Sequence, residues 1–428
     1  MSTMATSRCL FLLASIASFL PLSSSQPQPP ATSSLIFPVA KDEASRQYYT
    51  SIALGTPPSP MKAVLDLSGS YSWFDCGAAR YDPSSSPSYR RILCSSAGCR
   101  AARGGGCFND TCGVFVHNPL TEVVIGAGLG EDAVAVHHTD GIKYTSRGVI
   151  QLPFSCVPPE FTRSVSGAGN GVVALSIAPT SLATKLSTDL NLPHKLALCL
   201  PSSSSSSGHG DFYVGGGPYY RPPLKQDLSE SLLVTQLLID PVSRPPSHGS
   251  ASPSDQYFVD VTAVKVNLAP VNFKASLLTI DKNGRGGTKI STLTPYTVLH
   301  SAIYRALVAE FSRQAAEKKI RRAEPIPPFG ACFDVRSVRS GVAGPDVPAI
   351  VLVLRSDVQW RIEGANSMVR VSEEVMCLGF VEGGSSPMTA IVIGAHQMED
   401  NLVEFDMAST KFRFSNSLLL RNTSCSHP

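Results

Sequence analysis

Short apolar runs recur along most of the chain, and glycine, proline and serine residues separate them. Runs such as Tyr48–Leu54 and Met61–Leu67 are followed at once by turn residues. Many short strands with this punctuation are typical of an all-β sandwich or barrel. The pattern therefore predicts a protein made mainly of β-strands. The predicted strands are Leu35–Val39, Tyr48–Leu54, Met61–Leu67, Tyr71–Phe74, Val114–Val116, Ala133–Val136, Gly171–Leu175, Phe212–Val214, Tyr257–Val266, Ala349–Val353, Met368–Val371, Ile391–Gly394 and Leu402–Asp406.

Two stretches depart from this pattern and predict helices. Residues His300–Arg322 place an apolar stripe from Ile303 to Phe311 on one helix face, with charged residues elsewhere. Pro325 follows closely and forbids continuation of the helix. A second helix is expected over Ser181–Asp189. A few short helices should therefore accompany the strands.

The length of the chain suits two lobes. The 428 residues are too many for one small core, and the apolar fraction of 43% is enough to build two. The run Gly215–Pro218, followed by Arg221–Pro223, marks a boundary near the middle of the chain. We expect an N-terminal lobe over 26–220 and a C-terminal lobe over 221–428. The serine run Ser202–Ser207 is interpreted as a flexible turn without a function.

The charge of the chain argues against nucleic-acid binding. The formal net charge is +3, whereas a nucleic-acid binder needs a clustered basic stripe. The one dense basic run, Lys318–Arg322, closes the predicted helix. Cations are favourable at a helix C-terminus, so this run needs no nucleic-acid partner.

The first residues predict a secretory signal peptide over 1–25. Arg8 supplies the positive region, Cys9–Leu22 the apolar stretch, and Ser23–Ser25 the small residues before cleavage near Gln26. The apolar stretch is shorter than the roughly 20 residues that span a bilayer, and no later segment is long and apolar enough to do so. We expect a mature protein that is soluble and outside the cell.

The cysteine count fits an oxidising compartment. Of eleven cysteines, Cys9 leaves with the signal, and the remaining ten predict five disulfides. A zinc site is the alternative for the pairs Cys94/Cys99 and Cys107/Cys112, but the four-residue gaps are wider than those of zinc ribbons. Two glycosylation sequons begin at Asn109 and Asn422. The ten cysteines are Cys76, Cys94, Cys99, Cys107, Cys112, Cys156, Cys199, Cys332, Cys377 and Cys425.

An acidic residue closes one of the predicted strands. Asp66 ends the apolar run from Ala63, and the small residues Ser68–Ser70 follow. Alone this is not specific, because an aspartate at a strand end usually accepts N–H bonds from its turn. The second half has a matching context at Lys289–Tyr296, where Ser291 takes the acidic place.

Two other patterns do not indicate ligand sites. The stretch Gly126–Gly130 lacks the strand–helix context and the Lys-Ser/Thr ending of a nucleotide loop, so it predicts a β-hairpin turn. His137 and His138 are neighbours in a strand and point to opposite faces, so they cannot readily share one metal ion, and His117 adds no site. We expect no metal and no cofactor.

Taken together, these residues resemble the pepsin-like aspartic proteases. More closely, the chain is similar to the plant extracellular branch with the endoxylanase inhibitors, the basic seven-S globulins and the extracellular dermal glycoproteins. The stretches most specific to that branch are Asn366–Phe380 and Ile393–Asp406. The resemblance implies a bilobal double β-barrel with a central cleft. The matching stretches are Ile36–Lys41, Val64–Cys76, Lys195–Pro201, Tyr213–Pro218, Tyr257–Val266, Pro295–Phe311, Pro328–Phe333, Asn366–Phe380 and Ile391–Phe414.

The resemblance also implies loss of catalysis. Active members carry an aspartate in each lobe, and the two carboxyl groups share a proton while one activates water. Asp66 matches the first aspartate, but Ser291 matches the second, and a hydroxyl cannot replace a carboxylate base. The flap region, expected near Val123–Val136, has no tyrosine, and the strand at Leu35 leaves too little room for a prosegment. A slow protease and a storage or cell-wall glycoprotein remain the alternatives.

Partners and disulfides follow from the same resemblance. Members that inhibit microbial xylanases insert a histidine and a neighbouring leucine from the C-terminal lobe, and Arg421 and Thr294 stand in those places here. Arginine can pair with a glycosidase carboxylate; the alternative is that Arg421 is an ordinary surface residue. We expect a monomer of the apoplast or cell wall that binds a secreted microbial glycoside hydrolase and no membrane. The implied disulfides are Cys76–Cys156, Cys199–Cys425 and Cys332–Cys377, with Cys94, Cys99, Cys107 and Cys112 paired among themselves.

Overall fold

The computed structural model describes residues 1, 34–140, 144–165, 167–202, 208–239 and 254–426. The predicted signal peptide, the segment between it and the first strand, and most of the run Ser202–Ser207 lie outside the described residues. The chain divides into the units Met1–Ala31 and Thr32–Pro428, and the second carries all the elements below. No helix in the described ranges combines the length and apolarity that a bilayer crossing needs.

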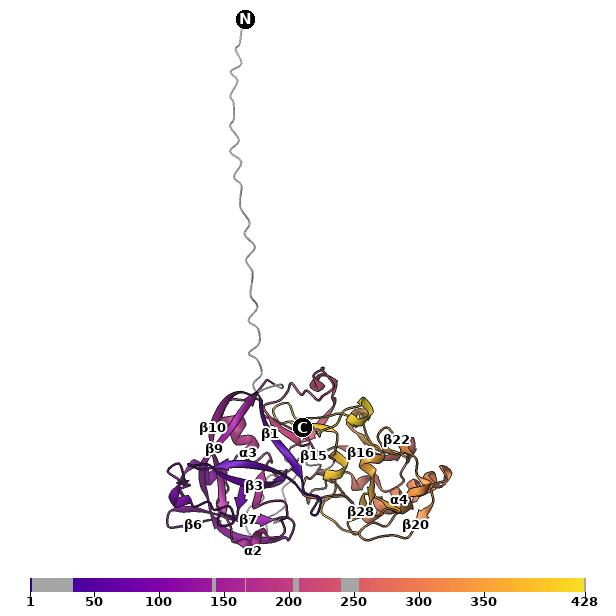
Figure 1. The fold of residues 1–428 in the computed structure, drawn as a ribbon, viewed down its shortest axis with the longest axis horizontal. Helices are drawn as coiled ribbons and strands as arrows, with labels where there is room; N and C mark the ends of the chain where they lie inside the picture. The colour runs from indigo at the N-terminus through magenta and orange to yellow at the C-terminus, as the bar shows by residue number, and fades with distance from the viewer. Residues whose placement is uncertain (2–33, 141–143, 166, 203–207, 240–253, 427–428) are drawn as a thin grey trace. The chain divides into compact units, whose positions relative to one another are not determined.

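Strands dominate the structure, as the pattern predicts (Figure 1). The helices are α1 Ala97–Ala101, α2 Pro159–Thr162, α3 Leu182–Asp189, α4 Ser301–Glu317 and α5 Gly364–Ser367. The strands of the first half are β1 Ser34–Lys41, β2 Tyr48–Leu54, β3 Ser59–Asp66, β4 Ser72–Phe74, β5 Arg90–Arg91, β6 Gly106–Phe108, β7 Thr111–Asn118, β8 Val123–Gly128, β9 Gly130–Thr139, β10 Tyr144–Cys156, β11 Gly171–Ala174, β12 Lys195–Cys199 and β13 Gly210–Val214. Those of the second half are β14 Leu233–Leu238, β15 Phe258–Val259, β16 Val261–Val266, β17 Ala269–Pro270, β18 Thr288–Ile290, β19 Thr297–Leu299, β20 Arg322–Ala323, β21 Cys332–Asp334, β22 Ser340–Gly341, β23 Gly344–Pro345, β24 Ile350–Leu354, β25 Gln359–Ile362, β26 Met368–Arg370, β27 Val375–Leu378, β28 Phe380–Glu382, β29 Ile391–Ile393, β30 Leu402–Asp406 and β31 Lys411–Phe414.

One arrangement of strands occurs twice. In the first half, β3 runs parallel to β11, which is antiparallel to β4, and β4 is parallel to β10. In the second half, β18 runs parallel to β29, which is antiparallel to β19, and β19 is parallel to β28. The two halves therefore share a topology, and the ends of β3 and β18 occupy equivalent places in it.

The core lies between these strands. Burial alternates along β2 and β9, so one face of each strand packs inward. Large aromatic side chains such as Phe154, Phe212, Trp360 and Phe405 are fully buried in one continuous hydrophobic cluster. Removal of this apolar surface from water is the main force that holds the strands together.

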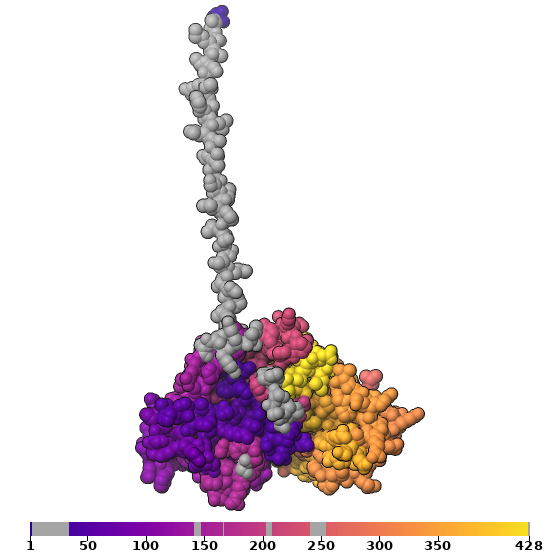
Figure 2. Space-filling view, viewed as in Figure 1, coloured from indigo at the N-terminus to yellow at the C-terminus, as the bar shows by residue number. Residues whose placement is uncertain are grey.

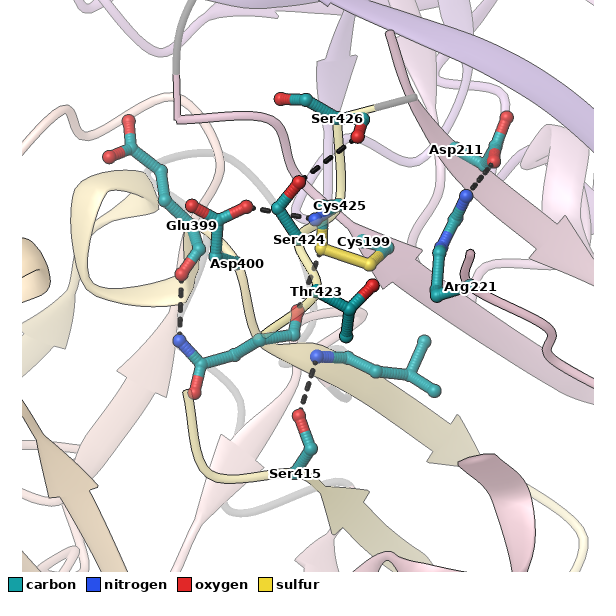
Figure 3. The surroundings of a disulfide bond; sticks show 12 residues. Cys199, Asp211, Arg221, Glu399, Asp400, Ser415, Thr423, Ser424, Cys425 and Ser426 are labelled. Atoms are coloured by element: carbon teal, nitrogen blue, oxygen red, sulfur yellow. Dashed lines mark hydrogen bonds and ion pairs between the residues drawn. A yellow bond between two sulfur atoms is a disulfide. The ribbon is translucent and has the colours of Figure 1, made fainter. Parts of the chain in front are cut away.

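The C-terminal strands are joined to the first half by a shared sheet. Strand β12 pairs with β13 on one side and with β30 on the other, and β30 continues through β31 to β14. In Figure 2 the yellow C-terminal atoms accordingly lie against the atoms of residues near 200–235. The Cys199–Cys425 disulfide crosses the same region, beside the buried ion pair of Arg221 and Asp211 with an N–O distance of 2.7 Å (Figure 3). The lobe boundary at 220/221 stays a prediction.

Both predicted helices are present, and one has a different end. Ser181 caps α3 at its N-terminus, whereas α4 ends at Glu317 rather than Arg322. Lys319 has a left-handed φ of 62°, and the N–H groups of Lys319 and Ile320 bond the carbonyls of Ala316 and Ala315, both at 2.9 Å. This Schellman ending turns the chain so that Ile320 is buried.

Two other expectations are corrected. The predicted strand Tyr257–Val266 is two strands in different sheets, because Asp260 leaves the ladder and bonds Arg355 through its carboxylate at 2.7 Å. The stretch Gly126–Gly130 is not a hairpin turn: it links β8 to β9, which belong to different sheets. Leu129 at the link is fully buried, and its N–H donates to the carbonyl of Cys112 at 2.9 Å, so the link is held in the structure instead of folding β9 back onto β8.

All five predicted disulfides form. The three pairs implied by the resemblance are Cys76–Cys156, Cys199–Cys425 and Cys332–Cys377. The remaining four cysteines, whose pairing could not be deduced, form Cys94–Cys107 and Cys99–Cys112.

Candidate functional site

A cavity of about 310 Å³ lies where the equivalent strands β3 and β18 end. Its wall is mostly polar and includes residues from both halves of the chain. It is lined by Asp66, Ser68, Gly69, Ser70, Tyr71, Trp73, Phe115, His117, Pro119, Leu120, Glu122, Gln256, Lys289, Ser291, Leu293, Thr294 and Val392. Asp66 therefore meets Ser291 and Thr294, which lie more than 220 positions later in the sequence, and Arg421 is not among the residues that line the cavity.

Asp66 is buried at the end of β3. It is 3% exposed, and its Oδ1 accepts hydrogen bonds from the backbone N–H of Ser68 at 2.7 Å and the Ser68 hydroxyl at 2.5 Å. The close turn needs Gly69, because a Cβ there would lie 2.7 Å from the second carboxylate oxygen. Burial raises the pKa of Asp66, although the bonds from Ser68 and Gly69 oppose that rise.

Ser291 follows β18 in the place equivalent to Asp66. Its N–H donates to the carbonyl of Ile393 at 3.0 Å, which continues the parallel pairing of β18 with β29. Its hydroxyl oxygen accepts bonds from the N–H and the hydroxyl of Thr294, at 3.2 and 3.1 Å. The second half thus presents a hydroxyl group where the first half presents a carboxyl group.

The residues that follow these two positions also differ. The Thr292 hydroxyl donates to the carbonyl of Leu65 at 2.6 Å and ties the turn of the second half to β3. Leu67 takes the equivalent place in the first half, and its side chain is apolar and buried. One half therefore keeps a polar cross-connection that the other half lacks.

Lys289 adds a cation to the cavity. Its Nζ donates to the amide oxygen of Gln256 at 3.3 Å, and its charge favours the ionised form of Asp66. Sequence reasoning missed both residues. Lys289 could have been found, because it lies two residues before Ser291 in a strand and so points to the same face. The cavity therefore contains the carboxyl group of Asp66 and the ammonium group of Lys289, and a hydroxyl group stands at the position equivalent to Asp66.

A hairpin borders the cavity. Strands β7 and β8 are joined at a tip that includes Pro119 and Leu120, and His117 pairs with Glu122 there at 3.2 Å. The flap is therefore at 111–128 and not at 123–136, because β9 belongs to the large sheet. The hairpin has no tyrosine; Tyr71, outside it, donates its hydroxyl to the carbonyl of Phe115.

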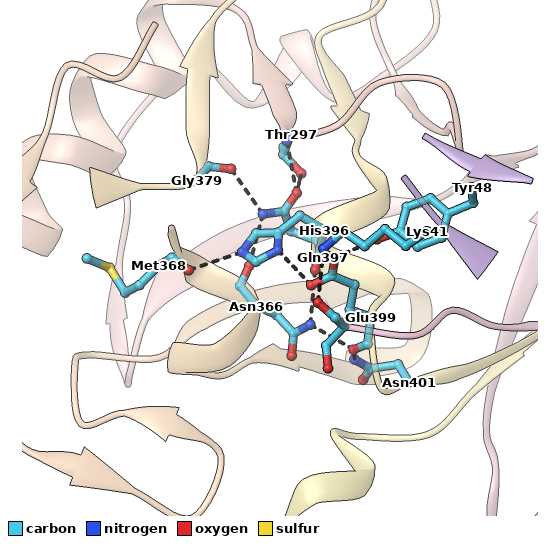
Figure 4. Close-up of polar contacts among 11 residues, drawn as sticks. Lys41, Tyr48, Thr297, Asn366, Met368, Gly379, His396, Gln397, Glu399 and Asn401 are labelled. Atoms are coloured by element: carbon cyan, nitrogen blue, oxygen red, sulfur yellow. Dashed lines mark hydrogen bonds and ion pairs between the residues drawn. The ribbon is translucent and has the colours of Figure 1, made fainter. Parts of the chain in front are cut away.

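The branch-specific stretch after β29 holds the loop that carries Ser291. The N–H groups of Ala395 and His396, in the 3-10 helix η6 Ala395–Met398, donate to the carbonyls of Thr294 and Pro295. The Gln397 side-chain oxygen accepts two bonds from Thr297, and its amide nitrogen donates to two backbone carbonyls (Figure 4). This stretch therefore supports the site without lining it.

A buried ionic cluster fastens the same stretch to the first half. Glu399 accepts bonds from Lys41 Nζ at 2.8 Å, the Tyr48 hydroxyl at 2.5 Å and His396 Nδ1 at 2.8 Å (Figure 4). Burial pushes the pKa of Glu399 upward, but His396 and Lys41 outweigh it and hold that pKa below its usual range. Burial raises the pKa of Tyr48, so the hydroxyl stays a donor.

The remaining predicted site residues lie elsewhere on the surface. Arg421 ends the 3-10 helix η7 Leu418–Arg421, where it donates to the Ser231 hydroxyl at 3.0 Å and to Gln226 at 3.4 Å. Asn422, next to it, and Asn109 are exposed, as glycosylation requires.

The described residues provide one group of potential metal ligands, Cys94, Cys107 and Asp110. The two cysteines are bonded to each other, so neither has a thiolate to offer.

Two family profiles match the chain. The profile described as "Xylanase inhibitor N-terminal" matches residues 48–216, and the one described as "Xylanase inhibitor C-terminal" matches residues 256–416. Each contains one copy of the repeated strand arrangement.

Similar proteins match over almost the whole length. "Probable aspartic proteinase GIP2" of Nicotiana benthamiana is 39% identical over 92% of this chain and 91% of that protein. "Basic 7S globulin" of Glycine max is 31% identical over 90% of this chain and 88% of that protein. The crystal structure of edgp is similar with a TM-score of 0.87 and 38% identity, covering 92% of this chain and 97% of that one. The predicted bilobal pepsin-like fold is confirmed, whereas the names of the relatives disagree over catalysis.

Proposed function

The chain belongs to the xylanase-inhibitor family of pepsin-like proteins, and we propose that it is a secreted, non-catalytic member that binds and inhibits a microbial glycoside hydrolase. The observation that carries this proposal is Ser291 in the place equivalent to Asp66. Acid protease chemistry needs a carboxylate base beside a carboxylic acid, and a serine hydroxyl is no such base. Burial raises the pKa of Asp66, and Lys289 opposes this rise, whereas no second carboxyl group is among the causes that shift it.

The other acidic residue of the cavity does not replace the missing carboxylate. Of the described residues that line it, Glu122 is the other acidic one, and it is exposed and paired with His117. The carbonyl of a bound peptide would therefore meet one acid and one ammonium group. These groups can hold a ligand, but they do not form a proton-sharing pair.

For the partner we propose Arg421 and Thr294 as contact residues. Arg421 makes hydrogen bonds to neutral side chains and no ion pair among the described residues, so its charge remains available for a carboxylate. Glycoside hydrolases expose two such carboxylates in the active site, and a bidentate arginine matches their geometry. Glycans on Asn109 and Asn422, secretion and a role in plant defence are parts of the same proposal.

An inhibition screen of the purified protein against microbial xylanases and glucanases tests this function. We expect at least one enzyme to be inhibited, and Arg421→Ala to weaken that inhibition by about tenfold or more, as loss of a charged interface anchor does. Arg305→Ala, an exposed arginine of α4, is the matched control and should leave inhibition unchanged. The proposal would be refuted if the immobilised protein retained no hydrolase from fungal culture filtrate and inhibited none of the enzymes in the screen.

A further inference from the structure

A second hollow lies on the three-stranded sheet β6–β7–β8. This groove has a volume of about 560 Å³, and Phe115 borders both it and the cavity that holds Asp66. Its floor contains Gly106 and Gly126, where an added Cβ would meet no atom within 4 Å. Phe108 and Phe115 are 77% and 61% exposed. Exposed apolar surface of this kind normally has something that covers it.

A glycosylation sequon lies at the rim of this groove. Asn109 and Asp110 form the two-residue turn between β6 and β7, and both have the positive φ that such a turn requires. Phe108 and Thr111 flank the turn, face each other across the hairpin, and line the groove. Arg91, another lining residue, donates to the Asn109 carbonyl at 3.2 Å and so holds the turn at the rim.

We propose that Asn109 carries an N-linked glycan whose first sugars pack on Phe108 and cover the groove. The bond forms between Asn109 Nδ2, which loses a proton, and C1 of a sugar that leaves its lipid diphosphate carrier. A sugar ring has apolar C–H faces and a rim of hydroxyl groups. The faces fit the aromatic side chains and the glycine floor, and the guanidinium of Arg91 and the hydroxyl of Thr111 are partners for the rim.

The tether favours this occupant over a free ligand. A free oligosaccharide or a second copy of the chain must lose its translational and rotational freedom on binding. A glycan attached at the rim is held at high effective concentration, so weak contacts suffice to order it. The inference rests on two parts of the proposed function, secretion and a glycan on Asn109, and it holds whether or not a hydrolase is bound.

The experiment uses the full chain secreted from a eukaryotic host. Mass spectrometry of glycopeptides should find Asn109 occupied. The variant Asn109→Gln should raise the fluorescence of an apolar dye by about twofold or more, because the groove is uncovered. Asn422→Gln is the matched control: it removes the other sequon, which does not border the groove, and should leave the dye signal unchanged.

A second variant distinguishes an uncovered groove from misfolding of Asn109→Gln, which would also raise the dye signal. The double variant Phe108→Ser, Asn109→Gln removes the glycan together with the exposed ring, and its dye signal should fall back toward that of the wild type. An unmodified Asn109, or equal dye binding by wild type and Asn109→Gln, would overturn the inference. Dimerisation of the glycosylated wild type through this face, or its saturable binding of free xylo-oligosaccharide in the groove, would overturn it as well.

Discussion

Asp66 is a buried carboxyl group whose equivalent position in the second half is Ser291. It keeps the tight turn with Ser68 and Gly69 and its buried place at the end of β3. Because the side chain is buried, its pKa is raised, and the fold therefore binds the proton more tightly than the unfolded chain does. Ionised Asp66 costs stability at neutral pH, and this cost disappears as the pH falls through the folded-state pKa.

Replacement of Asp66 by asparagine should remove that cost. We expect Asp66→Asn to raise the free energy of unfolding at neutral pH, because the amide carries no charge that must be buried. The gain should vanish at acid pH, where the carboxyl group is protonated in both states. Denaturant titrations of the wild type and the variant at neutral and acid pH measure the change in the free energy of unfolding. An equal change at the two pH values would show that burial does not set the pKa of Asp66.

The residues of the site could be predicted in part from the sequence. Asp66 and Ser291 stand at the ends of apolar strands, and their context repeats, so local pattern was sufficient to find them. Glu399 was found only as part of a family stretch. Its importance depends on Lys41 and Tyr48, which lie more than 350 positions away in the chain and approach it only through tertiary packing.

The 3-10 helix η6 and its buried cluster show what one short element contributes. Lys41 and Glu399 have side chains that are each 4% exposed, so neither charge has access to water as a substitute partner. Because the fold lowers the pKa of Glu399, the ionised side chain stabilises the fold at neutral pH. This stabilisation is lost as the pH falls through the folded-state pKa.

Removal of the Glu399 charge should therefore destabilise the fold strongly. We expect Glu399→Gln to lower the free energy of unfolding by about 3–5 kcal/mol, because the ammonium group of Lys41 stays buried without a counter-charge. Glu382→Gln breaks an exposed pair with Arg305 and is the control, with little expected change. Thermal unfolding of the two variants measures the difference in their stability. A similar loss of stability in both would contradict this account of the cluster.

Elements with a strong local pattern were predicted well, and those decided by packing were not. The pattern of apolar runs located β1, β2 and β3, but it missed β8, β10 and β14. The end of α4 depends on the burial of Ile320, and the break at Asp260 depends on Arg355, which directly follows β24 and lies 95 positions away. Neither contact leaves a periodic signal in the sequence, so pattern reasoning extended both elements too far.

At the scale of the whole unit Thr32–Pro428, the C-terminal strands are integrated into the first half. Strand β12 pairs with β30, and the Cys199–Cys425 disulfide joins residues that are 226 positions apart. Both cysteines are fully buried. A cross-link over so long a loop restricts the unfolded chain strongly.

Removal of this cross-link should cost more than removal of a short one. We expect the double variant Cys199→Ala, Cys425→Ala to lose about 2–5 kcal/mol of unfolding free energy. The pair Cys94 and Cys107, separated by 13 positions, is the control, and its removal should cost about 2 kcal/mol less by loop entropy. Equal losses in denaturant titrations would show that loop length does not determine the contribution of these bonds.

The central claim is that this pepsin-like fold binds without cutting. A fluorogenic peptide assay at acid pH, with and without pepstatin, tests it most directly. The account predicts no pepstatin-sensitive cleavage by the wild type, and the same rate of fluorescence change for wild type and Asp66→Ala. Cleavage that pepstatin blocks and Asp66→Ala abolishes would contradict it.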